Sequence, residues 1–92
     1  MMTKEQANNV VNELIRKPEY MMIKWKRFHS NQAWIGKFSE RYDFIKSYST
    51  IVGLIDKEER VLYELGKWSR TTSIHVSKIQ KELYTFYDFI KA

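Results

Sequence analysis

Residues 31–55, NQAWIGKFSERYDFIKSYSTIVGLI, decide the fold that the sequence predicts. Their apolar side chains recur at steps of three and four positions, as Trp34, Ile35, Phe38, Tyr42, Ile45, Tyr48, Val52 and Ile55. Such spacing is typical of one face of an amphipathic helix. We therefore expect a long helix over residues 32–55, with last turns weakened by Gly53 and an allowed break near residues 47–50.

Helical patterns also precede this stretch. Thr3 and Gln6 form a capping-box pattern ahead of an apolar face, and that face ends before Pro18. Proline is well tolerated at the first position of a helix, so a second helix is expected to begin there. The apolar residues of this expected helix continue to Phe28 and are distributed around almost its whole circumference. This distribution predicts that the helix is buried on two sides.

Two further helices are expected after residue 55. Asp56 and Glu59 form a second capping-box pattern, which would open a short helix. The turn-like run Ser69–Ser73 offers hydroxyl groups that could cap a final helix. The apolar positions of that helix have a heptad-like spacing, at Val76, Ile79, Leu83, Phe86 and Ile90.

Turn signals are scarce, which supports the helical interpretation. The chain has 1 Pro and 3 Gly, and sheets with tight hairpins usually need more of these residues. We therefore predict an all-α fold, a compact bundle of four to five helices that forms a single helical domain over residues 1–92. The expected core residues are Trp34, Phe38, Ile45, Val61, Leu62, Leu65, Ile79, Leu83 and Phe86.

The composition excludes several classes of protein. A chain of 92 residues is limited to one small domain, and 15% aromatic residues supply apolar surface for a core. With no Cys, the chain cannot form disulfides, a thiolate zinc site or a thiol nucleophile. No apolar run is long enough to cross a bilayer and no signal peptide is visible, so we expect a cytoplasmic protein of a bacterial host.

The sequence contains little that suggests catalysis. His29 and His75 are the only histidines, and neither has another ligand at metal-binding spacing. No glycine-rich phosphate loop is present, and the acidic residues of 56–59 are explained by the dipole of the expected helix. We therefore predict a protein that is not an enzyme and that has no cofactor and no metal site.

The net charge of +5 is unevenly distributed, because an acidic segment at residues 56–66 lies between two basic ones. The first basic spot is Lys24–His29, where Lys24 and Arg27 are candidate contacts to nucleic acid or to a protein partner. The alternative is that Trp25 and Phe28 belong to the core and the two cations form a solvated face.

The second basic spot runs from Lys67 to Lys81, over the final expected helix. Hydroxyl groups and an arginine at a helix entrance suit phosphate contacts, and a basic helix face suits the major groove. The alternative is an ordinary solvated face. The candidate DNA- or partner-binding residues of this spot are Arg70, Thr71, Thr72, His75, Lys78 and Lys81.

Two stretches of the C-terminal half carry a family resemblance. Ile55–Tyr63 has an acidic start followed by an arginine, an aliphatic pair and an aromatic residue. Ser69–Ile79 begins with serine, arginine and threonine and continues with basic and aliphatic positions. Residues 55–90 thereby resemble the end of ArpU-type phage transcriptional regulators, which is similar to sigma region 4 and binds DNA through a helix-turn-helix. Glu13–Tyr20 is also similar to an N-terminal helix with a proline stop in some members.

The chain departs from that family in one respect. Leu65–Trp68 joins the two stretches directly, so the middle helix of the helix-turn-helix is missing. A recognition helix without its supporting helix would not dock on DNA in the usual way. The resemblance therefore implies either a DNA-binding regulator or a relative that has lost DNA binding.

The sequence thus predicts a small non-enzymatic phage or mobile-element regulator that binds double-stranded DNA through its basic C-terminal helix. The alternative is a protein-binding inhibitor or adaptor of the phage anti-defence type, such as an anti-CRISPR, which contacts a nucleic-acid-handling protein directly. The second hypothesis rests on more aromatic residues than a small domain can bury. The candidate interface residues are Trp68, Tyr84, Tyr87 and Phe89. A homodimer through the last helix is compatible with both hypotheses.

Overall fold

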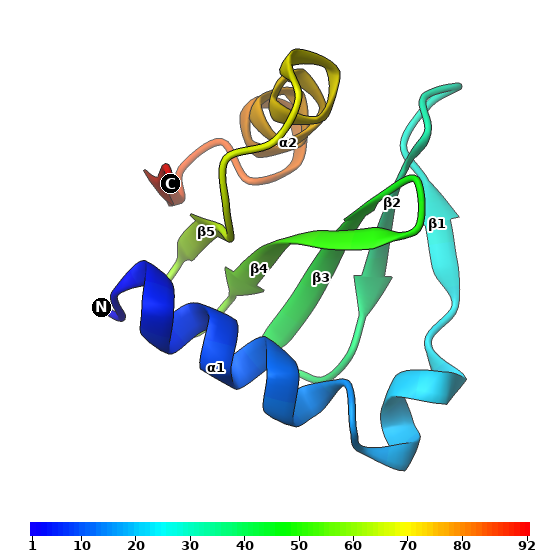
Figure 1. Ribbon diagram of the computed structural model, residues 1–92, viewed down its shortest axis with the longest axis vertical. Coiled ribbons are helices and arrows are strands. Elements are labelled where there is room, and N and C mark those ends of the chain that lie inside the picture. The colour runs from blue at the N-terminus through cyan, green and yellow to red at the C-terminus, as the bar shows by residue number, and fades with distance from the viewer.

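The computed structural model describes residues 1–92 and contains a six-stranded sheet with one α-helix on each face (Figure 1). The predicted all-α bundle is therefore wrong, and the protein has a mixed α/β fold. The elements in chain order are α1 (Lys4–Leu14), the 3-10 helix η1 (Pro18–Met22), β1 (Trp25–Arg27), β2 (Ala33–Lys37), β3 (Tyr42–Ser47), β4 (Thr50–Asp56), β5 (Val61–Glu64), α2 (Arg70–Leu83) and β6 (Asp88–Ile90).

The strands follow one another across the sheet in the order in which they occur in the chain. β1 to β5 form an antiparallel meander, and each strand pairs with its neighbour in sequence. After β5 the chain passes through α2 and returns as β6, which pairs with β5 in parallel. β1 therefore forms one edge of the sheet and β6 the other (Figure 1).

The core consists of two apolar layers, one on each face of the sheet. Successive side chains of a strand point to opposite faces. Phe44 and Leu54 accordingly pack against α1, whereas Ile45 and Ile55 pack on the side of α2. The hydrophobic core is therefore divided by the sheet, with both faces of its central strands buried.

Burial on both faces explains why residues 31–55 resemble a helix in sequence. The alternation of apolar and polar residues that identifies a strand disappears when neither face meets water. Phe44–Ile45 and Leu54–Ile55 are adjacent buried pairs, and each pair spans both layers of the core. The apolar positions of β2, β3 and β4 then coincide with helical spacing, although the segment contains no helix.

The scarcity of glycine and proline also misled the sequence-based prediction. Three turns of the meander place ordinary residues at positive φ, His29 at 54°, Tyr48 at 54° and Arg60 at 58°. Glycine is the default residue for that backbone region, and other residues adopt it at an energetic cost. The turns are thus present without the residues that usually mark them.

The two α-helices begin where capping chemistry predicted a start. Thr3 Oγ1 accepts a hydrogen bond from the Gln6 amide at 3.1 Å, and the Thr3 amide donates to Gln6 Oε1 at 2.9 Å. Ser69 caps α2 through the Thr72 amide at 3.4 Å. Val76 and Ile79 of α2 are buried, as expected.

The other two helix predictions are wrong. The helix expected from Pro18 is limited to the short η1, and the chain then enters β1. Asp56 does accept hydrogen bonds from the amides of Glu58 and Glu59, at 3.1 and 3.2 Å, but these close the turn between β4 and β5. The first helix implied by the resemblance to ArpU-type regulators is therefore absent, because Ile55–Tyr63 forms strand, turn and strand.

The expected core is partly confirmed. Ile45, Val61, Leu62, Leu65 and Ile79 are buried, whereas Trp34 and Phe38 are half-buried. Leu83 is 55% exposed and Phe86 is 91% exposed, because α2 ends at Leu83 and the chain then turns toward β6. No helix has the length and hydrophobicity that a membrane span requires.

Candidate functional site

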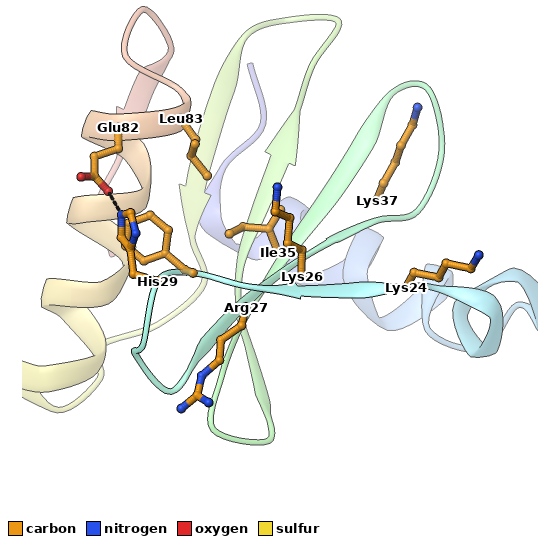
Figure 2. Close-up of a pocket in the computed structure, with 9 residues that line it drawn as sticks. Lys24, Lys26, Arg27, His29, Ile35, Lys37, Glu82 and Leu83 are labelled. Atoms are coloured by element: carbon orange, nitrogen blue, oxygen red, sulfur yellow. Dashed lines mark hydrogen bonds and ion pairs between the residues drawn. The ribbon is translucent and has the colours of Figure 1, made fainter.

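A basic groove lies beside the β1 edge of the sheet, next to the C-terminal end of α2 (Figure 2). It encloses about 730 Å³. We call this site the β1–α2 groove. The nine residues that line it are Lys24, Lys26, Arg27, Phe28, His29, Ile35, Lys37, Glu82 and Leu83.

The rim of the β1–α2 groove is strongly cationic. Four of its lining residues are lysine or arginine, with the guanidinium of Arg27 directed to the other face of the sheet, and Glu82 is its only carboxylate. Lys24, Lys26 and Arg27 take part in no salt bridge, and Lys37 reaches only the exposed Glu40, at 3.5 Å. The positive charge of the rim is therefore largely uncompensated within the protein.

One ion-pairing contact crosses the groove. His29, in the turn between β1 and β2, places Nε2 2.9 Å from Glu82 Oε2 on α2 (Figure 2). Both side chains are more than half exposed, so the contact is weak as a source of stability. The contact joins the β1–β2 turn to the end of α2. It also gives Glu82, the only acidic residue of the groove, a partner within the protein.

The floor of the groove is apolar. Phe28 is buried, Ile35 is half-buried and Leu83 is exposed. Lys26 pairs with Ile35 across β1 and β2, so their side chains share one face of the sheet. Figure 2 draws Lys26 beside Ile35, with Arg27 pointing away from them. The site thus combines an exposed apolar surface with cations around it.

The opposite face of the same strands carries a stack of cations and tryptophans. Lys46 Nζ lies 4.1 Å from the centre of the Trp25 ring and 5.7 Å from that of Trp34. Arg27 Cζ lies 5.7 Å from the Trp34 ring, and its Nε donates to the Asn31 carbonyl at 2.8 Å. These cation–π contacts cover the indole faces with the protein's own charges. Arg27 also braces the turn after β1.

Two of the residues predicted to bind DNA from the final helix are buried. Ser47 Oγ on β3 lies 3.1 Å from Thr72 Oγ1 and 3.3 Å from His75 Nδ1. Thr72 and His75 therefore attach α2 to the sheet and are not available for phosphate contacts. The sequence pattern could not reveal this, because the residue opposite α2 comes from a strand that was expected to be helical.

The remaining predicted residues are divided between two surfaces. Lys24 and Arg27 line the β1–α2 groove, whereas the other four lie exposed on α2 and do not line it. The exposed residues of α2 are Arg70, Thr71, Lys78 and Lys81. Sequence reasoning placed Lys26 and His29 within the first basic spot without selecting them as contacts, expected Leu83 in the core, and missed Lys37 and Glu82. Pairing of β1 with β2 and packing of α2 bring these five residues to the groove.

The four residues of the predicted aromatic interface are half-buried and contact the protein's own core. Tyr84 donates its hydroxyl proton to Asp43 Oδ2 at 2.8 Å, and burial followed by the charge of Asp43 raises the pKa of Tyr84. Tyr87 packs edge-on against Tyr84 at 5.1 Å between ring centres. Trp68 and Phe89 are half-buried against the core. These four aromatic residues support the C-terminal packing.

Buried His75 gives the fold a pH dependence. Burial, and then the charge of Lys78, lowers the pKa of His75. The unfolded chain therefore binds this proton more readily, so stability should fall as the pH drops below about 6.5. We expect thermal unfolding between about pH 7.5 and pH 5.5 to show a decreasing midpoint, and His75→Gln to remove most of that decrease. An equal decrease in the variant would contradict a role for His75.

A family model described as a family of unknown function (DUF8033) matches residues 3–88. The chain belongs to this family. The match extends from the N-cap of α1 to the first residue of β6, so the β1–α2 groove lies wholly within the DUF8033 region. No curated protein and no solved structure matches the chain, and none of the comparisons links it to ArpU-type regulators. In this DUF8033 domain, no three His, Asp or Glu side chains are placed to hold a metal ion.

Proposed function

We propose that this DUF8033 protein binds nucleic acid and that the β1–α2 groove is its interface. The observation that carries the proposal is the location of the charge. Residues 16–37 contain six Lys and Arg residues against one acidic residue, and the rest of the chain is balanced. The phosphate backbone is the polyanion that such a surface would attract, with affinity supplied by the release of counterions.

The proposal moves the interface from the exposed face of the C-terminal helix to the β1 edge of the sheet, where only the last residues of α2 take part. Thr72 and His75 of α2 are buried, so that helix presents fewer groups to a ligand than its sequence suggests. The fold also offers no helix-turn-helix through which α2 would enter the major groove. We propose a non-enzymatic binding protein, acting as a regulator of a phage or mobile element in the bacterial cytoplasm.

A protein-binding function is the second candidate, and one observation favours it. Met21, Met22 and Phe86 are exposed apolar side chains outside the groove. Exposed methionine and aromatic residues are common in protein interfaces. An inhibitor or adaptor that contacts a nucleic-acid-handling protein would use such exposed side chains, and a homodimer through the end of the chain would use Phe86.

The test is equilibrium binding of a fluorescent oligonucleotide at about 50 and 200 mM salt. The Lys24→Gln/Lys26→Gln variant should bind about 3- to 10-fold more weakly and lose about one to two units of the salt slope. The Lys78→Gln/Lys81→Gln variant removes the same charge from α2 and should bind nearly as the wild type does. The reverse pattern would move the interface to α2, and no binding by the wild type at the lower salt would refute the proposal.

A further inference from the structure

We infer that the β1–α2 groove binds a single-stranded segment of nucleic acid, with an unpaired base on the apolar floor and flanking phosphates at the lysines of the rim. The inference rests on the proposed function and makes it more specific. The exposed part of the floor is formed by Leu83 and half-buried Ile35, whereas Phe28 is buried and its ring lies 4.5 Å from that of His29. The rim contributes Lys24, Lys26 and Lys37. This combination of apolar and cationic groups is expected to favour single-stranded over double-stranded nucleic acid.

The exposed floor is the first reason to favour a single strand. Leu83 keeps 55% of its surface exposed while lying beside Ile35 and Phe28 in the groove. A duplex presents phosphates and sugars on its outside and keeps its bases paired, so it would leave this apolar surface in water. An unpaired base has an apolar face that could cover the floor, and burial of apolar surface is favourable.

The size of the groove agrees with that occupant. Its volume of about 730 Å³ lies within the range of roughly 300–1,000 Å³ that is usual for sites that bind small molecules. One or two nucleotides of a strand would fill such a volume. The lysines then have room to contact the phosphates on either side, since Lys24 and Lys37 extend outward at one end of the groove (Figure 2).

The tryptophans of the same hairpin do not offer an alternative stacking platform. Lys46 lies over both Trp25 and Trp34, and Arg27 lies over Trp34 from its place at the turn. Bases would have to displace these cations before they could stack on the indole rings. The floor of the β1–α2 groove is therefore the apolar surface of this end of the sheet that is open to a base.

Glu82 is expected to oppose binding, because it is the one carboxylate of the groove. Its Oε2 is held 2.9 Å from His29 Nε2, so the charge stays at the end of the site. Glu82→Gln removes the negative charge and keeps an oxygen acceptor for His29. We expect this variant to bind a single strand about 2- to 5-fold more tightly, and more so at low salt.

The decisive experiment compares a thymidine oligomer of about ten nucleotides with a hairpin duplex that carries the same number of phosphates. The wild-type protein should bind the single strand about 5- to 10-fold more tightly, since covering the exposed surface of an aliphatic side chain such as Leu83 contributes about that much. Equal or tighter binding of the duplex would overturn the inference and leave the proposed function intact. If neither is bound, the proposed function fails as well.

A matched pair of variants tests the role of the floor. Leu83→Ser alters the groove, and Phe86→Ser makes a similar change at a residue outside it; both side chains are exposed, so both variants should fold. Leu83→Ser should weaken single-strand binding about 5-fold, because it removes apolar surface that the base would cover, without changing duplex binding. Phe86→Ser should change neither. The inference is overturned if Leu83→Ser binds the single strand as tightly as Phe86→Ser does, with both shown to be folded by circular dichroism.

Discussion

Phe44→Ala is expected to lower the free energy of unfolding by about 3–5 kcal/mol, the usual cost of removing a fully buried aromatic side chain. Phe44 lies on β3 beneath α1 and has no exposed surface. Its ring meets Tyr20 and Phe38 edge-on, with centres 5.8 and 5.6 Å away. Truncation would leave a cavity between the sheet and α1. The expected loss is a large fraction of the total free energy of unfolding of a small domain.

The matched control is Phe86→Ala, in which the same side chain is removed from a position that is 91% exposed. We expect a change within about 0.5 kcal/mol, as is usual for surface substitutions. Urea unfolding followed by circular dichroism measures both variants. Comparable losses would contradict a core centred on the sheet and would favour the helical seam that the sequence suggests.

Asp56→Ala is expected to destabilise the protein by about 2–3 kcal/mol, because a buried carboxylate that accepts several hydrogen bonds is removed while Arg41 stays in contact with water. Asp56 ends β4 and is buried, and it accepts hydrogen bonds from Arg41 Nε and Nη2 at 3.2 and 3.0 Å. Its Oδ1 also accepts from the turn amides of Glu58 and Glu59. The alanine variant would lose the ion pair and the turn contacts together.

Asp56→Asn separates these contributions. Its amide oxygen can still accept from the two turn amides, whereas the charge opposite Arg41 is lost, so we expect about half of the alanine effect. Burial alone would raise the pKa of Asp56, but hydrogen bonds from Arg41 and from the Glu59 and Glu58 amides outweigh it, and the pKa is lowered.

The lowered pKa of Asp56 has a consequence for acid stability. The ionised form is favoured in the folded state, so this stabilisation is complete above about pH 4 and is lost as the pH falls through the folded pKa. Unfolding of the wild type and of Asp56→Asn should therefore converge in acid. Parallel stability curves down to about pH 2 would show that the Asp56 charge contributes little.

The helices were predictable from sequence because their signals are local. Thr3 with Gln6, and Ser69 ahead of α2, supply caps within one turn of the helix they begin. The strands were not predictable, because Phe44–Ile45 and Leu54–Ile55 face opposite layers of a core that covers both sides of the sheet. Only the position of each helix in space, which no local pattern contains, reveals that both faces are buried.

The candidate site was predictable in its charge and not in its shape. Lys24 and Arg27 were found because a cluster of cations is visible in any secondary structure. A helix would place those two side chains together, whereas in β1 it is Lys26 that shares a face with Ile35. Leu83 reaches the same groove from a helix far along the chain, so the apolar floor depends on the tertiary fold.

The position of α2 after the five strands of the meander affects the order in which the core forms during synthesis. Ribosomes release the N-terminal part first, and β1 to β5 need only neighbouring strands to pair. The layer that contains Ile45, Ile55 and Leu62 stays open until α2 has been synthesised, because Val76 and Ile79 provide its cover. A nascent chain that lacks α2 would therefore expose one apolar face of the sheet, and synthesis of α2 would end the period in which that face is vulnerable to aggregation.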